Sequence, residues 1–385
     1  MRTITSLAAG GGILAAAIGV TGTSLASTAS ADTFSPTVGH VYIDGNTVGT
    51  NTLDVLDRHA DGSLTPTQGS PFAIGGAGTG TGLASQGAIQ TSPDGKFLLA
   101  VDAGSNEVSV LRVGSDGTPA LAGAPVWSGG VEPTSIAVSP DWVVYVSNVG
   151  AGGSNYAGFR LTRAGRLIAI PHATVAVPEG SGVGDVLFNG AGDRLVGTRV
   201  NPSLIDSFTV DPAGRLTAAA GSPFAAQTAG PFGSEFRPTN PDQLYVSNAH
   251  AGSGNGTVSA FLDGADGALT SIGSSPYADL QTAPCWVEIT HDGKFLFAIN
   301  TASANLSRFA INDDGSLTLL GSTSFNDGVG AIDARLSPDG KTLSVVGGRS
   351  HLVTTFAVSG GDLTELPSSP VALPAAGAPS GIVVL

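Results

Sequence analysis

The chain has 385 residues, of which 12% are charged and 41% are hydrophobic, and it contains 56 glycines. This composition excludes a disordered or mainly helical chain and favours an all-β fold, in which many short strands are joined by tight turns. The formal net charge of −14 repels nucleic-acid phosphates, so no nucleic-acid partner is expected.

The N-terminus has the pattern of a cleaved signal peptide. Arg2 precedes an apolar run over residues 13–20, and small residues follow as far as Ala29-Ser30-Ala31. The apolar run is too short to cross a bilayer core of about 30 Å, so no membrane span is expected. We therefore predict a signal peptide over residues 1–31 and a secreted, extracellular protein that begins near Asp32.

A short phrase with a central glycine recurs seven times, at intervals of 46–55 residues. This period matches one four-stranded blade of a β-propeller. Residues 32–385 are therefore predicted to form one domain, a seven-bladed β-propeller. The seven copies are Asp61-Gly62-Ser63-Leu64-Thr65, Asp116-Gly117-Thr118, Gly165-Arg166-Leu167, Gly214-Arg215-Leu216-Thr217, Gly267-Ala268-Leu269-Thr270, Gly315-Ser316-Leu317-Thr318 and Gly361-Asp362-Leu363-Thr364.

A second repeated block predicts a hairpin within each blade. It is clearest at residues 92–102, where Ser-Pro-Asp-Gly-Lys precedes an apolar run. Proline fixes φ and Asp-Gly supplies a left-handed residue, so the block is interpreted as strand, tight turn, strand. Related blocks begin at Ser139, Arg237, His291 and Ser337, and residues 189–194 are a degenerate copy.

The two ends of the chain are predicted to share one blade. The mature N-terminus begins with a second strand, residues 41–44, and the C-terminus ends with an inner strand that lacks a partner, residues 381–385. Pairing these strands removes two exposed sheet edges and closes the ring.

The hairpin phrases, the Tyr-Val-Ser-Asn strand ends and residues 282–286, Thr-Ala-Pro-Cys-Trp, resemble the lactonase family of seven-bladed propellers from about residue 41 to the C-terminus. The resemblance implies metal-free hydrolysis of a lactone ring by an Arg-His pair on an inner strand and a glutamate after an asparagine. The matching positions here are Phe232-Gly233 and Ala249, so none of those catalytic residues is carried over.

Counting back from the hairpin turns locates the side chains that face the central channel. Side chains alternate between the two faces of a strand, so positions three and five residues before the turn share one face. The channel of blades five to seven should therefore contain Glu235, Glu288, Arg335, Asp333 and Trp286, with Asp185 at the matching position of blade four.

These side chains allow two interpretations. Glu235 and Glu288 can act as base or acid while Arg335 orients a carbonyl or an anion, with Asp333, Trp286 and Asp185 as ligand contacts. The alternative is a buried ion-pair network that only holds adjacent blades together.

Three residues near the ends of second strands are further binding candidates. Asn248 and Asn300, like Asn148, end equivalent strands, where they bind ligand hydroxyls or satisfy the backbone of the following turn. His250 follows one of these strands and is a candidate base, or else a solvated loop residue.

The sequence predicts neither a metal site nor a cofactor. The six histidines show no zinc-binding spacing, and no haem or phosphate-loop motif is present. Cys285 has no second cysteine to pair with, so it is interpreted as a small buried hydrophobe.

Two functions therefore remain open. One is a secreted hydrolase of a small lactone or sugar-acid derivative. The other is a non-catalytic extracellular propeller that binds a carbohydrate, a small acid or a protein. In either case we expect a monomer.

Overall fold

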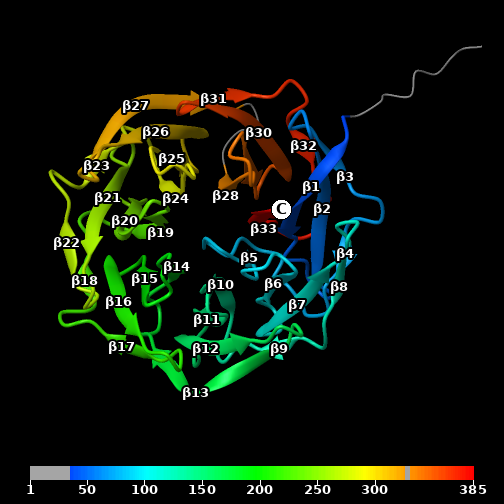
Figure 1. Ribbon diagram of the computed structural model, residues 1–385, viewed down its shortest axis with the longest axis horizontal. Helices are drawn as coiled ribbons and strands as arrows, with labels where there is room; N and C mark the ends of the chain where they lie inside the picture. Colours follow the sequence, from blue (N-terminus) through cyan, green and yellow to red (C-terminus); the bar gives the residue numbers. More distant parts are fainter. Residues whose placement is uncertain (1–34, 326–329) are drawn as a thin grey trace, which may run out of the picture. The chain divides into compact units, whose positions relative to one another are not determined.

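The strands form seven antiparallel sheets arranged around one axis (Figure 1). The structure is a computed structural model that describes residues 35–325 and 330–385. The predicted signal peptide, residues 1–31, lies outside the described residues. Within the described part, no helix is long and apolar enough to cross a membrane.

Each sheet is one blade, in which four strands follow one another from the axis to the outer edge. The prediction of a seven-bladed propeller is confirmed. In five blades, a further strand of two residues pairs with the third strand. From the axis outward, blade one contains β33 (Ser380–Val384), β1 (Thr37–Asp44), β2 (Thr52–His59) and β3 (Leu64–Pro66), with β4 (Phe72–Ala73); blade two contains β5 (Ile89–Thr91), β6 (Phe97–Asp102), β7 (Glu107–Val113) and β8 (Pro119–Leu121), with β9 (Val126–Trp127); blade three contains β10 (Pro133–Val138), β11 (Val143–Asn148), β12 (Asn155–Leu161) and β13 (Leu167–Ala176).

The remaining blades repeat this order. Blade four contains β14 (Val183–Phe188), β15 (Arg194–Arg199), β16 (Leu204–Val210) and β17 (Leu216–Ala218), with β18 (Phe224–Ala225); blade five contains β19 (Pro231–Arg237), β20 (Asn240–Asn248), β21 (Thr257–Asp263) and β22 (Leu269–Ser271), with β23 (Tyr277–Ala278). Blade six contains β24 (Pro284–Ile289), β25 (Phe295–Asn300), β26 (Asn305–Ile311) and β27 (Leu317–Ser324); blade seven contains β28 (Ala331–Leu336), β29 (Thr342–Gly347), β30 (Leu352–Ser359) and β31 (Asp362–Glu365), with β32 (Val371–Ala372).

Blade one is assembled from both ends of the chain, as predicted. In the β1–β33 pair, Tyr42 lies opposite Val383 and Ile43 lies opposite Ile382. The backbone N–H of His40 also donates to the carbonyl of Leu385 at 2.9 Å. Because β33 contacts both β28 and β5, this pairing completes the inner ring of strands (Figure 1).

In blades two and seven, a serine and an aspartate close the predicted hairpin turn. In blade two, the Ser92 hydroxyl donates to Asp94 Oδ1 at 2.8 Å and accepts the Phe97 N–H at 3.0 Å. Gly95 takes the left-handed conformation, with φ of +68°. Ser337 and Asp339 repeat the hydroxyl–carboxylate bond in blade seven.

The recurring glycine of the outer turns receives a hydrogen bond from the preceding blade. The hydroxyl of Tyr42 in β1 donates to the carbonyl oxygen of Gly117 at 2.8 Å. Tyr145 makes the same bond to Gly214, and Tyr245 makes it to Gly315. The glycine phrase therefore marks a contact between blades as well as a turn.

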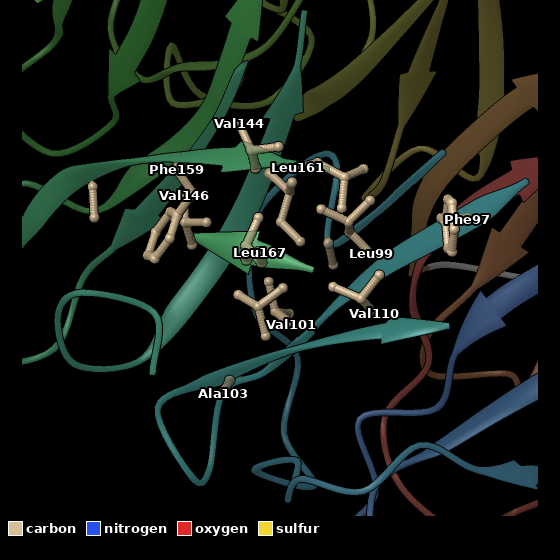
Figure 2. Close-up of a cluster of buried hydrophobic side chains, with 14 of the residues drawn as sticks. Phe97, Leu99, Val101, Ala103, Val110, Val144, Val146, Phe159, Leu161 and Leu167 are labelled. Carbon is tan, nitrogen blue, oxygen red and sulfur yellow. The ribbon is translucent and has the colours of Figure 1, made fainter. Parts of the chain in front are cut away.

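Hydrophobic side chains fill the spaces between neighbouring blades. Between blades two and three, Phe97 and Leu99 belong to one buried cluster with Val144, Phe159 and Leu167 (Figure 2). Burying a side chain of this size stabilises a fold by about 1.5–3 kcal/mol. The core is thus a series of layers between blades, and the polar side chains of the inner strands lie around the axis.

Candidate functional site

The ring has two faces that differ at the axis. We call the face where the inner strands begin the loop face. The face where they end in the Ser-Pro-Asp-Gly-Lys turns is the hairpin face. The inner strands run from the loop face to the hairpin face, so a residue's position along its strand fixes the end of the channel to which it belongs.

The loop face is covered at the axis by residues 83–87, which we call the strap. The backbone N–H of Gln86 donates to Gly184 in β14 at 2.8 Å. The Gln86 side-chain amide donates to Val287 in β24 at 3.1 Å. Gln86 is only 4% exposed. The strap therefore joins inner strands of blades four and six above the channel.

Trp286, Asp185 and Asp333 lie in the layer directly below the strap. The indole N–H of Trp286 donates to the carbonyl of Ser85 in the strap at 3.1 Å. Asp185 accepts hydrogen bonds from the backbone N–H and hydroxyl of Ser234, at 3.0 and 2.7 Å. These predicted ligand contacts are engaged in holding the strap and the inner strands.

Burial raises the pKa of both aspartates in this layer. The pKa of Asp185 rises to about 6 although it accepts several hydrogen bonds. The pKa of Asp333 rises to about 7, against the opposing effects of Arg335 and the Ala334 N–H. Asp333 Oδ2 is buried and accepts no hydrogen bond from the described residues. Desolvation of the charged form dominates at both positions.

Glu235, Glu288 and Arg335 lie together nearer the hairpin face. Glu288 Oε2 accepts a hydrogen bond from the Arg335 guanidinium at 3.0 Å, and Glu288 Oε1 accepts the Leu336 N–H at 2.8 Å. Glu235 Oε2 accepts the Ile289 N–H at 3.0 Å. Each glutamate therefore leans toward the inner strand of the next blade. Glu288 pairs directly with Arg335, and both of these residues influence the pKa of Glu235.

The electrostatics of this cluster favour one ion pair beside a neutral carboxyl group. Burial, and then the negative charge of Glu288, hold the pKa of Glu235 well above its ordinary value. Burial raises the pKa of Glu288 as well, and Arg335 opposes that rise. Burial also works against the charge of Arg335, but the surrounding carboxylates raise its pKa above the ordinary value. We assign the negative charge to Glu288 and the proton to Glu235.

A pocket of about 330 Å³ opens beside this cluster where the inner strands end. The Arg335 side chain is 26% exposed, whereas Glu288 behind it is 4% exposed. The pocket lies between the inner strands β5, β28 and β33 and the turn that follows β24. Its lining residues are Gln90, Thr91, His291, Arg335, Leu336, Pro338, Val383 and Val384.

Asn248, Asn300 and His250 belong to the other face. Asn248 pairs with the first residue of its inner strand, and Asn300 does the same in blade six. Both side chains are fully buried. The Asn248 amide donates to Ser259 Oγ at 2.8 Å, and the Asn300 amide donates to Asp279 Oδ2 at 2.8 Å. His250 is exposed. The structure does not bring these three residues to the pocket.

Sequence reasoning missed His291 as a pocket residue, and it missed the strap. The signal for His291 was present, because it replaces the proline that starts the turn at Pro93, Pro140 and Pro338. No local signal marks the strap, whose bonds join positions about 200 residues apart. Among the described residues, no three His, Cys, Asp or Glu side chains are grouped to hold a metal ion.

A family model described as "Lactonase, 7-bladed beta-propeller" matches residues 33–184, 194–334 and 257–378. The chain belongs to this lactonase family. No curated protein matches the sequence.

Many solved structures are similar to this one. A protein of Bacteroides uniformis proposed to be a 6-phosphogluconolactonase is 18% identical with a TM-score of 0.72, over 90% of this chain and 99% of that one. The periplasmic gluconolactonase of Pseudomonas aeruginosa is 19% identical with a TM-score of 0.68, over 90% and 99%. At these identities the likeness shows the fold alone.

The positions at which the lactonase resemblance implies an Arg-His pair contain apolar groups here. Phe232 is buried with its ring centre 5.4 Å from that of Trp286. A side chain at Gly233 would collide with the Oε1 atom of Gln86. The strap therefore fills the space that larger residues would need, and chemistry at this end of the channel is disfavoured.

Proposed function

We propose that the chain is a secreted, metal-free lactone hydrolase that acts in the pocket on the hairpin face. One observation carries the proposal: Arg335, fixed by Glu288, forms part of the wall of a pocket that His291 also lines. Membership of the lactonase family supports the reaction class. The lactonases among the structural neighbours support a sugar lactone as the kind of substrate to test.

Arg335 is suited to stabilise the charge that develops on a lactone carbonyl oxygen. A guanidinium is a permanent cation with several N–H donors. Glu288 holds it at 3.0 Å, and Leu336 in turn holds the second oxygen of Glu288. Donors fixed before the reaction stabilise a developing oxyanion without reorganisation. In this proposal Arg335 contacts the substrate and Glu288 is a positioning residue.

His291 is proposed as the general base. Its imidazole takes a proton from water while the water oxygen bonds to the carbonyl carbon. The ring C–O bond then breaks, and the imidazolium returns the proton to the departing ring oxygen. The product is an open hydroxy acid, whose carboxyl proton passes to solvent. Glu235, neutral beside the ion pair, limits the negative charge around Arg335.

A second candidate function is ligand binding without catalysis. It is favoured by the engagement of both glutamates within the fold: Glu235 accepts the Ile289 N–H and Glu288 accepts the Leu336 N–H, so neither is free to act as acid or base. A role confined to holding blades together requires only such bonds. Under this alternative, the pocket binds a carbohydrate or small acid unchanged.

Ring-opening kinetics at neutral pH on a panel of sugar and aliphatic lactones separate the two candidates. Arg335→Gln should lower kcat/KM by about 100- to 1,000-fold, the usual cost of one oxyanion donor. His291→Asn should lower it by about 100-fold or more, as for loss of a general base. His172→Asn, an exposed histidine on β13, is the matched control and should match wild type.

Two results would overturn the hydrolase proposal. One is the absence of turnover above background for every lactone by folded wild-type protein. The other is full activity in both variants, with folding checked by circular dichroism and thermal melting. Glu235→Gln adds a further check, because a neutral amide replaces a neutral carboxyl group and kcat/KM should change by less than about 10-fold.

A further inference from the structure

We propose that the pocket accepts an uncharged lactone and rejects one that carries a phosphate or carboxylate group. This inference rests on the proposed function, because it names the substrate class of the same pocket. It is carried by the charges around Arg335 and by the composition of the remaining wall.

The charge of Arg335 is already compensated by the protein. Glu288 lies 3.0 Å from its guanidinium. Among the neighbouring carboxyl groups, Glu288 has the largest effect on the pKa of Arg335, and Asp333 follows. An anionic ligand at Arg335 would have to compete with Glu288, whereas a neutral carbonyl oxygen can accept an N–H that the salt bridge leaves free.

The rest of the pocket supplies no permanent cation among the described residues. Gln90 and Thr91 are neutral hydrogen-bonding groups, and Val383 and Val384 are apolar. Phosphate sites in proteins are built from Arg and Lys clusters or from helix N-termini. The pocket wall instead matches a ligand with neutral hydroxyl groups and an apolar ring face. A pocket volume of about 330 Å³ suits a small molecule.

Lysines near the hairpin face are paired within their own turns. Lys96 lies 3.4 Å from Asp94, and Lys294 and Lys341 each lie 3.7 Å from the aspartate of their turn. None of the three lines the pocket. The rim of this face therefore contributes little net positive charge to attract a phosphorylated ligand.

The same charges favour product release. Hydrolysis converts a neutral lactone into a hydroxy-acid anion at neutral pH. The anion forms beside the negative charge of Glu288, which disfavours a second negative charge there. We expect the hydroxy acid to inhibit weakly, with an inhibition constant at least 10-fold above the KM of its lactone.

The test compares glucono-1,5-lactone with its 6-phosphate, which differ only in the charged group. Wild type should show a kcat/KM at least 100-fold higher for the neutral lactone. Gln90→Lys places a cation in the pocket and should raise the relative kcat/KM for the phosphate at least 10-fold. Thr270→Lys adds the same charge at an exposed position of β22, away from the pocket, and is the matched control that should leave the preference unchanged.

The outcomes separate this inference from the proposed function. Preference of wild type for the phosphate would overturn the inference and leave lactone hydrolysis standing. If neither lactone is hydrolysed, calorimetry with glucono-1,5-lactam and its 6-phosphate decides. Binding of the neutral lactam alone supports the charge argument without catalysis. Tighter binding of the phosphate, or binding of neither lactam, overturns the inference.

Discussion

At the scale of single residues, the carboxyl groups of the channel differ in how the fold accommodates them. Glu288 has a guanidinium partner, and Asp185 accepts two hydrogen bonds from Ser234. Asp333 has one buried oxygen without a donor among the described residues, and its pKa rises to about 7. A carboxyl group with a raised pKa binds its proton more tightly in the folded than in the unfolded chain. Stability therefore falls as the pH rises from about 4 to about 7.

Asp333→Asn should reduce this loss of stability. The amide cannot ionise, so the variant avoids a cost of about 4 kcal/mol at pH 8, at about 1.4 kcal/mol per pKa unit. We expect the variant to melt at a higher temperature than wild type at pH 8, and the two to melt alike at pH 4. Asp141→Asn, an exposed turn residue, is the control and should not alter the melting temperature at either pH. An equal shift at both pH values would contradict the assigned cause.

Period-2 alternation predicted which residues face the channel, because the geometry of a strand fixes it. Glu235, Glu288 and Arg335 converge for this reason. Alternation does not predict how far along the channel axis a side chain lies from a loop that is distant in the sequence. Trp286 and Asp185 were therefore grouped with Arg335, although the structure has them below the strap.

At the scale of elements, β33 makes the contacts that close the ring. Its residues Ile382 and Val383 are almost fully buried, and the strand contacts β1, β28 and β5. The sequence predicted this pairing because an inner strand without partners and a blade without an inner strand stand at opposite ends of the chain. The strap was not predictable in the same way, since its partners belong to blades three, four and six.

Deleting residues 380–385 should destabilise the whole ring. The deletion removes the inner strand of blade one and exposes the edge of β1, so we expect the melting temperature to fall by more than 10 °C or folding to fail. Ile382→Ala gives a milder version, because truncating a buried isoleucine costs about 2–5 kcal/mol. Leu262→Ala, at a residue 45% exposed, is the control and should change stability by less than 1 kcal/mol. A truncated protein that melts like the full-length chain would refute this closure.

At the scale of the whole molecule, the propeller provides a channel whose two ends are unlike. The strap fills the loop face, and Phe232 and Gly233 stand where the lactonase resemblance implies catalytic groups. The hairpin face has the pocket with Arg335 and His291. Repetition in the sequence predicted the ring. The difference between its ends depends on contacts between blades, which no single repeat contains.

The central claim is that ligand binds at the hairpin face. A crystal structure with glucono-1,5-lactam, a non-hydrolysable analogue, tests this claim most directly. We predict the lactam carbonyl oxygen within hydrogen-bond distance of the Arg335 guanidinium, with His291 beside the carbonyl carbon and the strap in place. A lactam bound below a displaced strap on the loop face, away from Arg335, would contradict the account.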